Sequence, residues 1–169
     1  MVLVSSLLVE VAANLRRRSG QIEPAFSTRQ IIEACFPDTL VTGGSLPPGI
    51  DEMVSRRADG PVIIYARSLP GPCQRFAIAH ALAHLLFDNS SARVRPGCLG
   101  IPANEERADA FAAELLAPLD ELAPYVGCGP SRDPEEHEIY LDQVDEIASH
   151  FALPAHVIDS RIRLLQLEY

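Results

Sequence analysis

The chain has 169 residues, 47% of them hydrophobic, which is the length and composition of one globular domain with its own core. This excludes an intrinsically disordered chain and a disulfide-stapled mini-protein. Its 14 basic and 23 acidic side chains give a formal net charge of −9, which argues against phosphate-driven nucleic-acid binding as the main activity. The short basic run Arg16-Arg17-Arg18 is interpreted as a helix end rather than a nucleic-acid patch.

No segment is expected to reach or cross a membrane. The apolar stretch near the N-terminus has no basic residue before it and is interrupted by Glu10, unlike a signal peptide. No run approaches the roughly 18 apolar residues of a membrane span. The cysteines are scattered without a Cys-x-x-Cys pair, which predicts free thiols and a cytoplasmic protein. They are Cys35, Cys73, Cys98 and Cys128.

The first half of the chain predicts two helices followed by strands. Apolar spacing predicts a helix over residues 7–15 that stops at Gly20. A second helix runs from a cap at Ser27 or Thr28 to Pro37. Glycines and prolines make residues 43–49 a turn-rich region. Strands are expected at 51–57 and, more clearly, at the β-branched and aromatic residues 62–65.

The second half predicts helices separated by loops. Residues 74–87 and 105–116 are expected to be helical, with a loop at 90–104 between them and a break at 127–134. The tail predicts two amphipathic helices, over about 140–167, joined near Pro154 and shaped like a helix-turn-helix. Because these helices carry few basic residues, packing on the core is favoured over DNA reading. The expected architecture is a single α+β domain over residues 1–169, with a small mixed sheet backed by helices.

The segment His80-Ala81-Leu82-Ala83-His84 predicts a metal site. Histidines four residues apart lie on one helix face, one turn apart, so their ring nitrogens can converge on one zinc ion. The next helix opens with Glu105 and has Asp109 one turn later. Glu105 suits a third ligand, with Glu106 as its competitor, and Asp109 suits a carboxylate that orients a ligating imidazole. Read alone, these acids could simply be favoured by the helix dipole.

The two segments together resemble the ImmA/IrrE metallopeptidases. The resemblance rests on Gln74-Arg75-Phe76-Ala77-Ile78-Ala79-His80-x-x-x-His84 and on Glu105-x-x-Ala108-Asp109-x-Phe111-Ala112-Ala113-Glu114-Leu115-Leu116-x-Pro118. It implies a zincin-like fold and a zinc endopeptidase that cleaves a partner helix-turn-helix repressor encoded nearby. Such cleavage releases stress-response, mobile-element or phage-defence genes.

One residue departs from the family pattern. The motif is His-Glu-x-x-His, and Ala81 stands where the glutamate is expected. That glutamate is the general base, whose loss typically costs on the order of 10²–10⁴ in rate. The chain is therefore expected to bind metal and to be nearly inactive, either as a natural pseudo-peptidase or through an introduced alanine. Retention of the rest of the signature favours the introduced alanine. The alternative function is a non-catalytic regulator that binds a repressor or a nucleic-acid signal.

Cys98 is a further candidate, because it lies in an Arg/Pro/Gly-containing segment between the histidines and Glu105. A thiolate there could fill the fourth zinc position and hold the enzyme inactive, in a way similar to the cysteine switch of latent matrix metalloproteases. The activating signal would then be bound nucleic acid, or oxidation that consumes the thiolate. The alternative is a small buried loop residue. Three remaining histidines could stabilise an oxyanion, although a structural role is favoured for each. They are His137, His150 and His156.

Overall fold

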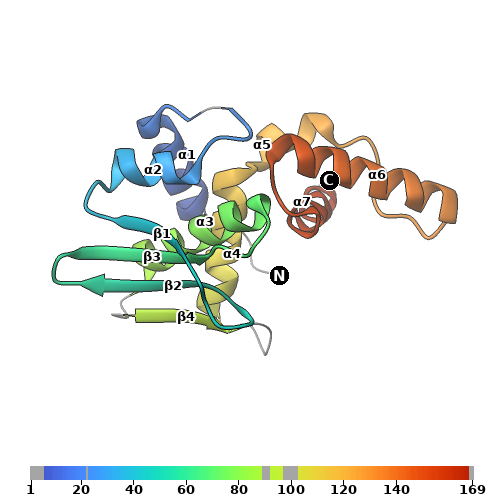
Figure 1. Ribbon diagram of the computed structural model, residues 1–169. Coiled ribbons are helices and arrows are strands. Elements are labelled where there is room, and N and C mark those ends of the chain that lie inside the picture. The colour runs from blue at the N-terminus through green and yellow to red at the C-terminus, as the bar shows by residue number, and fades with distance from the viewer. Residues whose placement is uncertain (1–5, 22, 89–91, 97–102, 168–169) are drawn as a thin grey trace.

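The computed structural model describes residues 6–21, 23–88, 92–96 and 103–167, with strands gathered on one side and helices on the other (Figure 1). The predicted α+β fold is confirmed. The sheet has four strands in the order β1-β3-β2-β4. β1 and β3 pair in parallel, and β2 runs antiparallel to both β3 and β4. The strands are β1 Leu40–Gly44, β2 Ile50–Arg57, β3 Gly60–Ala66 and β4 Ala92–Pro96.

Two of these strands lie where the sequence predicted turns or a loop. β1 includes Gly43 and Gly44, and β4 ends at Pro96, so local composition favoured turns at both. Both strands lie at the edges of the sheet, where only one side needs backbone partners. Long-range pairing with β3 and β2 therefore decides their conformation.

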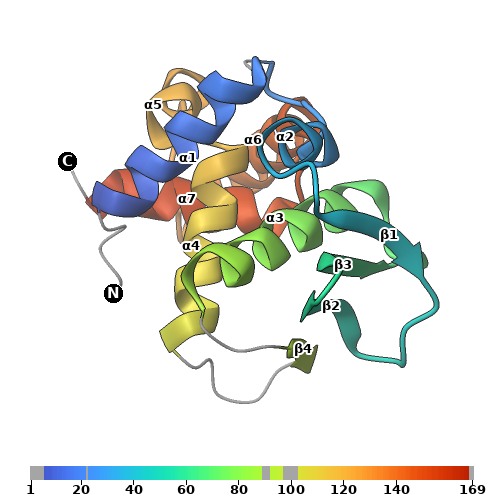
Figure 2. The ribbon, with the colours of Figure 1, turned by 90° about the vertical axis from the view of Figure 1, so that its left-hand side faces the viewer.

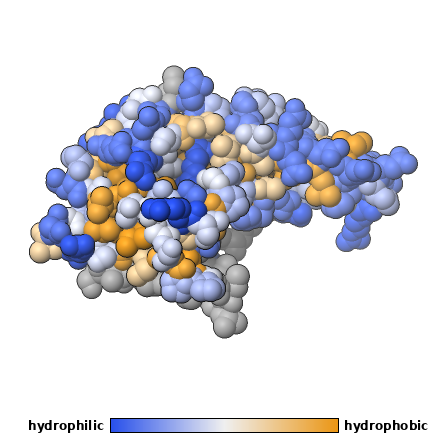
Figure 3. All heavy atoms as spheres, viewed as in Figure 1, coloured by the Kyte–Doolittle hydropathy of each residue, from blue (hydrophilic) through white to orange (hydrophobic). Residues whose placement is uncertain are grey.

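Strand β2 directs alternate side chains to opposite faces of the sheet. Glu52 and Val54 are 2% and 4% exposed, and Val54 belongs to the main hydrophobic core. Met53 lies on the other face and is half-buried, on the side where Figure 3 shows hydrophobic residues gathered over the sheet. The register between β2 and β4 shifts between Ile50 and Met53, an irregularity of the kind that re-aims side chains beside functional sites.

Helices α3 (Gly71–Phe87) and α4 (Ala103–Leu116) form the centre of the molecule. α3 packs against β2, β3 and α4, and Figure 2 shows it crossing in front of α4 beside the sheet. Every residue of α3 from Phe76 to His84 is buried, since the helix is covered on all sides. α3 begins three residues before the predicted start, with Pro72 in its first turn, where a missing backbone N–H costs nothing.

Helices α1 (Ser6–Ser19) and α2 (Thr28–Cys35) lie near the predicted positions. Gly20 follows α1 with a φ of +70°, the left-handed conformation that glycine adopts readily at a helix end. Arg16, in the basic run, is 6% exposed and forms an ion pair of 2.7 Å with Glu121. This part of the run therefore holds α1 against the segment after α4.

The first of the two C-terminal helices begins earlier than predicted, and the second follows Pro154 as predicted. α6 starts at Pro134, where the Asp133 side chain accepts hydrogen bonds from the amides of Glu135 and Glu136. This cap sets the start of the helix, and the half of α6 nearest it extends away from the body (Figure 1). The elements after α4 are α5 Leu119–Leu122, the 3-10 helix η1 Ala123–Tyr125, α6 Pro134–Phe151 and α7 Ala155–Leu167.

Both helices of the tail bury apolar side chains in the main core. Tyr140 and Phe151 of α6 and Ile158 of α7 are each 0% exposed. Arg161 of α7 is 1% exposed, forms a close ion pair with Glu114 of α4 and donates a hydrogen bond to a backbone carbonyl after α4. The tail is thus packed as the sequence favoured, by apolar burial together with a buried ion pair. Among the described residues, none of the helices has the length and apolar character required to span a bilayer.

Candidate metal centre

Two buried histidines lie side by side on α3. His80 and His84 are 0% and 3% exposed, and the centroids of their rings are 4.7 Å apart. Their spacing of four residues places them on one helix face, one turn apart. Because α3 is covered by the sheet and by α4, the neighbouring elements determine how both imidazoles are oriented.

A carboxylate holds the Nδ1 atom of each ring. Nδ1 of His80 lies 2.5 Å from Oε1 of Glu52 on β2, and Nδ1 of His84 lies 2.8 Å from Oδ2 of Asp88, just after α3. An ionised carboxylate only accepts hydrogen bonds, so each Nδ1 is the protonated nitrogen. Each Nε2 is then left with the lone pair that binds a metal, which is the usual arrangement behind a histidine ligand.

Asp88 is itself held in place by the first turns of α4. Arg107 donates a hydrogen bond to Oδ1 of Asp88 at 2.5 Å, and Asn104 donates one to Oδ2 at 3.4 Å. Burial alone would raise the pKa of Asp88, but its hydrogen bonds with His84, Asn104 and Arg107 outweigh burial and hold this pKa below its ordinary value. The carboxylate is therefore ionised at neutral pH and fixes the orientation of His84.

The Nε2 atoms of both rings face the carboxylates of α4. Nε2 of His80 lies 3.5 Å from Oε2 of Glu105 and 3.3 Å from Oδ1 of Asp109. Nε2 of His84 lies 3.5 Å from Oε1 of Glu105. These separations exceed the roughly 2.7–2.9 Å of a charge-assisted hydrogen bond. Two ring nitrogens and two carboxylates thus face one another at distances longer than those of short hydrogen bonds.

This set of donors fits zinc. Zinc takes nitrogen and oxygen ligands at about 2.0–2.1 Å in tetrahedral sites, so neighbouring ligand atoms are then about 3.3–3.4 Å apart. The nitrogen-to-oxygen separations of 3.3 and 3.5 Å agree with that value. Imidazole and carboxylate are also the donor types that zinc accepts.

A second grouping of the same residues is possible. Glu52, His80 and His84 each offer one atom, and these three atoms lie within 4.8 Å of one another. However, Oε1 of Glu52 is at hydrogen-bonding distance from Nδ1 of His80, on the opposite side of the ring from Glu105. A hydrogen bond of 2.5 Å leaves no room for an ion between the two atoms. Glu52 therefore acts on the centre through His80.

The structure brings most of the predicted site residues together, with one change of role. His80, His84 and Glu105 converge, whereas Glu106 is exposed on α4. Asp109 was expected to orient an imidazole, but it faces the Nε2 of His80, and Glu52 and Asp88 orient the rings instead. The physical reason is that β2 and the end of α3 already occupy both Nδ1 positions.

The other candidate residues have different outcomes. Ala81 is 0% exposed and lies in the fully buried middle part of α3. Cys98 lies outside the residues that the structure describes, so its role as a zinc-blocking thiol stays a prediction. The three remaining histidines are exposed on the tail, where His150 packs against Tyr125 with ring centroids 4.6 Å apart.

Sequence reasoning missed two residues of the centre, and each had a signal. Asp88 follows His84 by four residues, as His84 follows His80, so it continues the same face of the helix. Glu52 alternates with Val54 on a strand, which places an acidic side chain on the face that packs against the core. An inward acid on a strand requires a partner, and a histidine was the natural one.

The fold and the centre together define a class of protein. A buried helix with His-x-x-x-His, an acid from the next helix and a mixed sheet packed on the first helix are the framework of a zincin-like metallopeptidase. The family model of the IrrE N-terminal-like domain, Peptidase_M78, matches residues 37–163, which is most of the chain. The chain belongs to this family of peptidases. No match was found among curated proteins.

Proposed function

We propose that this chain holds zinc through His80, His84 and Glu105, and that the centre is that of an endopeptidase without its general base. The observation that carries the proposal is the convergence of two buried Nε2 atoms on Glu105 at 3.5 Å each. When bound, zinc would supply a Lewis acid towards a peptide carbonyl and would lower the pKa of water. The chain's own residues orient the two imidazoles through Glu52 and Asp88.

Position 81 determines how far the chemistry can proceed. A glutamate there would accept a proton from the attacking water and pass it towards the leaving amine. The methyl group of Ala81 can do neither, and Ala81 is 0% exposed on the helix that carries both histidines. The chain as it stands is therefore proposed to retain the metal and to hydrolyse peptides slowly or not at all.

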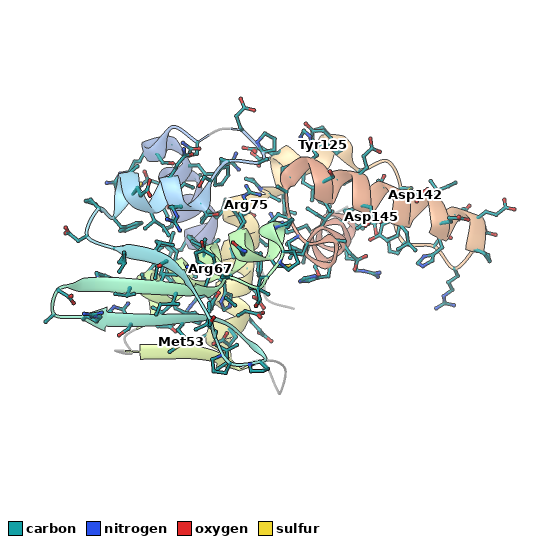
Figure 4. The ribbon with its side chains drawn as sticks, viewed as in Figure 1. Met53, Arg67, Arg75, Tyr125, Asp142 and Asp145 are labelled. Carbon is teal, nitrogen blue, oxygen red and sulfur yellow. The ribbon has the colours of Figure 1, made fainter. Side chains whose placement is uncertain are left out.

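The proposed substrate is a helix-turn-helix repressor encoded beside this chain. Membership of the IrrE N-terminal-like family supports this proposal. The charge of the chain supports it too, because a DNA-binding repressor carries a basic surface and this chain has a net charge of −9. Much of that charge lies on α6, where exposed acids such as Asp142 and Asp145 point outward (Figure 4). The proposed result of cleavage is derepression of the genes that the repressor controls.

A second function is favoured by Ala81 itself. Without the general base, the same fold could bind the repressor, or a nucleic-acid signal, and regulate it without cleavage. Arg16 is an unsuitable contact for nucleic acid, because it is buried and paired with Glu121. Arg17 and Arg18 are exposed, but the net charge of −9 disfavours a nucleic-acid partner, so a repressor is the simpler form of this alternative.

The experiment restores the missing carboxylate. Ala81→Glu is incubated with zinc and the neighbouring repressor, and products are identified by mass spectrometry. Ala81→Gln is the matched control, since it has nearly the same size but no base. Cleavage by Ala81→Glu alone, abolished by chelation, supports the peptidase.

A second measurement covers the case in which a larger residue at this buried position disturbs the fold. Binding of the repressor to the unmodified chain is measured directly, with circular dichroism of each variant as a check of folding. Well-folded Ala81→Glu that binds the repressor but leaves it intact favours the regulator. The absence of both binding and cleavage contradicts both functions.

A further inference from the structure

Asp109 faces the centre but is not one of the three proposed zinc ligands. Its Oδ1 atom lies 3.3 Å from Nε2 of His80, slightly closer than either oxygen of Glu105 lies to its histidine. The role of orienting the imidazoles is already filled, because Glu52 and Asp88 hold the two Nδ1 atoms. Asp109 instead shares the side of His80 on which a metal would bind.

The two carboxylates of α4 reach the centre because they are four residues apart. Residues at this spacing lie one turn apart on the same helix face, as His80 and His84 do on α3. Two pairs of this kind on packed helices present two nitrogens and two carboxylates to the same space. The separation of 3.3 Å between Asp109 and His80 matches that of neighbouring ligands around tetrahedral zinc, about 3.3–3.4 Å.

We propose that Asp109 is the fourth ligand of the metal and closes its coordination sphere in the resting chain. The inference rests on the proposed zinc site and assigns one more residue to it. Zinc sites with four protein ligands are structural, whereas catalytic sites keep one position open for water or substrate. A closed sphere and the missing carboxylate at position 81 have the same consequence, a centre in which no water is poised for attack.

Asp109 is also the ligand best placed to leave. Its side chain is 34% exposed, against 16% for Glu105 and 3% or less for the two histidines. A carboxylate at the solvent side of the centre can exchange with water or with an incoming carbonyl without disturbing the buried donors. The closed state is therefore reversible, and opening requires only that this side chain withdraw.

The test uses cobalt(II) in place of zinc, because the visible spectrum of cobalt reports its coordination. Acetohydroxamate, a small chelating ligand, is added to the cobalt-loaded unmodified chain and to Asp109→Ala. Asp109→Asn retains the shape of the side chain but offers a weaker donor. Glu106→Ala is the matched control, because it removes the same charge from an exposed neighbouring position on α4. Thermal melting of each apo-protein shows whether it is folded.

Hydroxamate is expected to reach the cobalt ion more readily in the Asp109 variants than in the unmodified chain. The unmodified chain and Glu106→Ala require a higher concentration of hydroxamate to change spectrum than Asp109→Ala and Asp109→Asn do, because in them the hydroxamate must first displace the Asp109 carboxylate. Cobalt affinity falls at least the roughly tenfold that loss of a supporting contact costs, and it falls only in the Asp109 variants.

Three results would overturn the inference. If hydroxamate changes the spectrum of the unmodified chain as much as that of Asp109→Ala, the fourth position is open and only the role of Asp109 is lost. If a thiolate-to-cobalt band is present and disappears in Cys98→Ser, the fourth donor is sulfur. If the unmodified chain binds no cobalt or zinc, the proposed metal site fails together with this inference.

Discussion

Replacement of Glu52 by glutamine is expected to weaken metal binding without unfolding the chain. Glu52 is 2% exposed, and its Oε1 lies 2.5 Å from Nδ1 of His80. Glutamine retains an oxygen acceptor in nearly the same volume but removes the negative charge that makes the imidazole a stronger donor to the metal. Such supporting contacts are typically worth 10–100-fold in affinity, or about 1.4–2.7 kcal/mol.

The stability of the apo-protein is expected to respond differently from metal affinity. An ionised carboxylate at this depth costs free energy to desolvate, and its neutral replacement removes that cost. Apo Glu52→Gln is therefore expected to unfold at a urea concentration close to or above that of the unmodified chain. This separates a role in orienting His80 from a role in holding the fold.

The assay is competition for zinc with a chromophoric chelator at a fixed pH. Asp51→Asn is the control, since it removes a charge from the preceding residue of β2, which is only partly buried. The reasoning is refuted if Glu52→Gln binds zinc as tightly as Asp51→Asn does. A loss of cobalt affinity in Glu52→Gln as large as that in Glu105→Gln would show instead that Glu52 is a ligand.

Two further predictions concern the tail. Glu114→Ala leaves the guanidinium of Arg161 buried without its carboxylate, so urea denaturation should show a loss of about 3–5 kcal/mol, and a loss below 1 kcal/mol would contradict this. The hydroxyl of Tyr140 donates a hydrogen bond to Asp159 at 2.5 Å. Burial and this hydrogen bond raise the pKa of Tyr140. The hydrogen bonds that Asp159 accepts from Arg163 and Tyr140 lower the pKa of Asp159. Folding favours neutral Tyr140, so the contribution of Tyr140 to the free energy of unfolding is complete below about pH 10 and is lost as the pH rises further. Folding favours ionised Asp159, so the contribution of Asp159 is lost as the pH falls below about 4. Chemical denaturation across this range should show both losses, and Tyr140→Phe should lose stability near neutral pH but show no Tyr140-dependent loss above pH 10.

How much of the centre the sequence could predict depends on how local each contact is. His80 and His84 form a pair within one helix, which helical periodicity predicts. Glu105, in the first turns of the next helix, was added because a carboxylate suits a third ligand beside such a pair, and the structure brings it to both rings. Glu52 precedes His80 by 28 residues and meets it only because β2 packs on α3. Whether Asp109 faces Nδ1 or Nε2 depends on which other carboxylates reach the ring, and spacing along α4 carries no such information.

In the fold, too, local features were predicted from the sequence and long-range contacts were not. The longer helices were predicted because the pattern of apolar residues along a helix is a local property, whereas the short α5 and η1 were not predicted. Even the start of α6 could have been found from Asp133 and Pro134, a helix-capping residue followed by a proline. The edge strands β1 and β4 were missed because the glycines and prolines at and beyond their ends favour turns, and only their neighbours in the sheet supply hydrogen bonds. The buried pair of Arg161 and Glu114 likewise joins residues 47 positions apart.

The most direct test of the metal centre is the zinc content of the purified chain, measured by inductively coupled plasma mass spectrometry after zinc loading and dialysis. The proposal predicts one zinc per chain, lost when His80 and His84 are both replaced by alanine and retained when the exposed His156 is replaced. A chain that retains no zinc, or a double variant that retains as much as the unmodified chain, would contradict it.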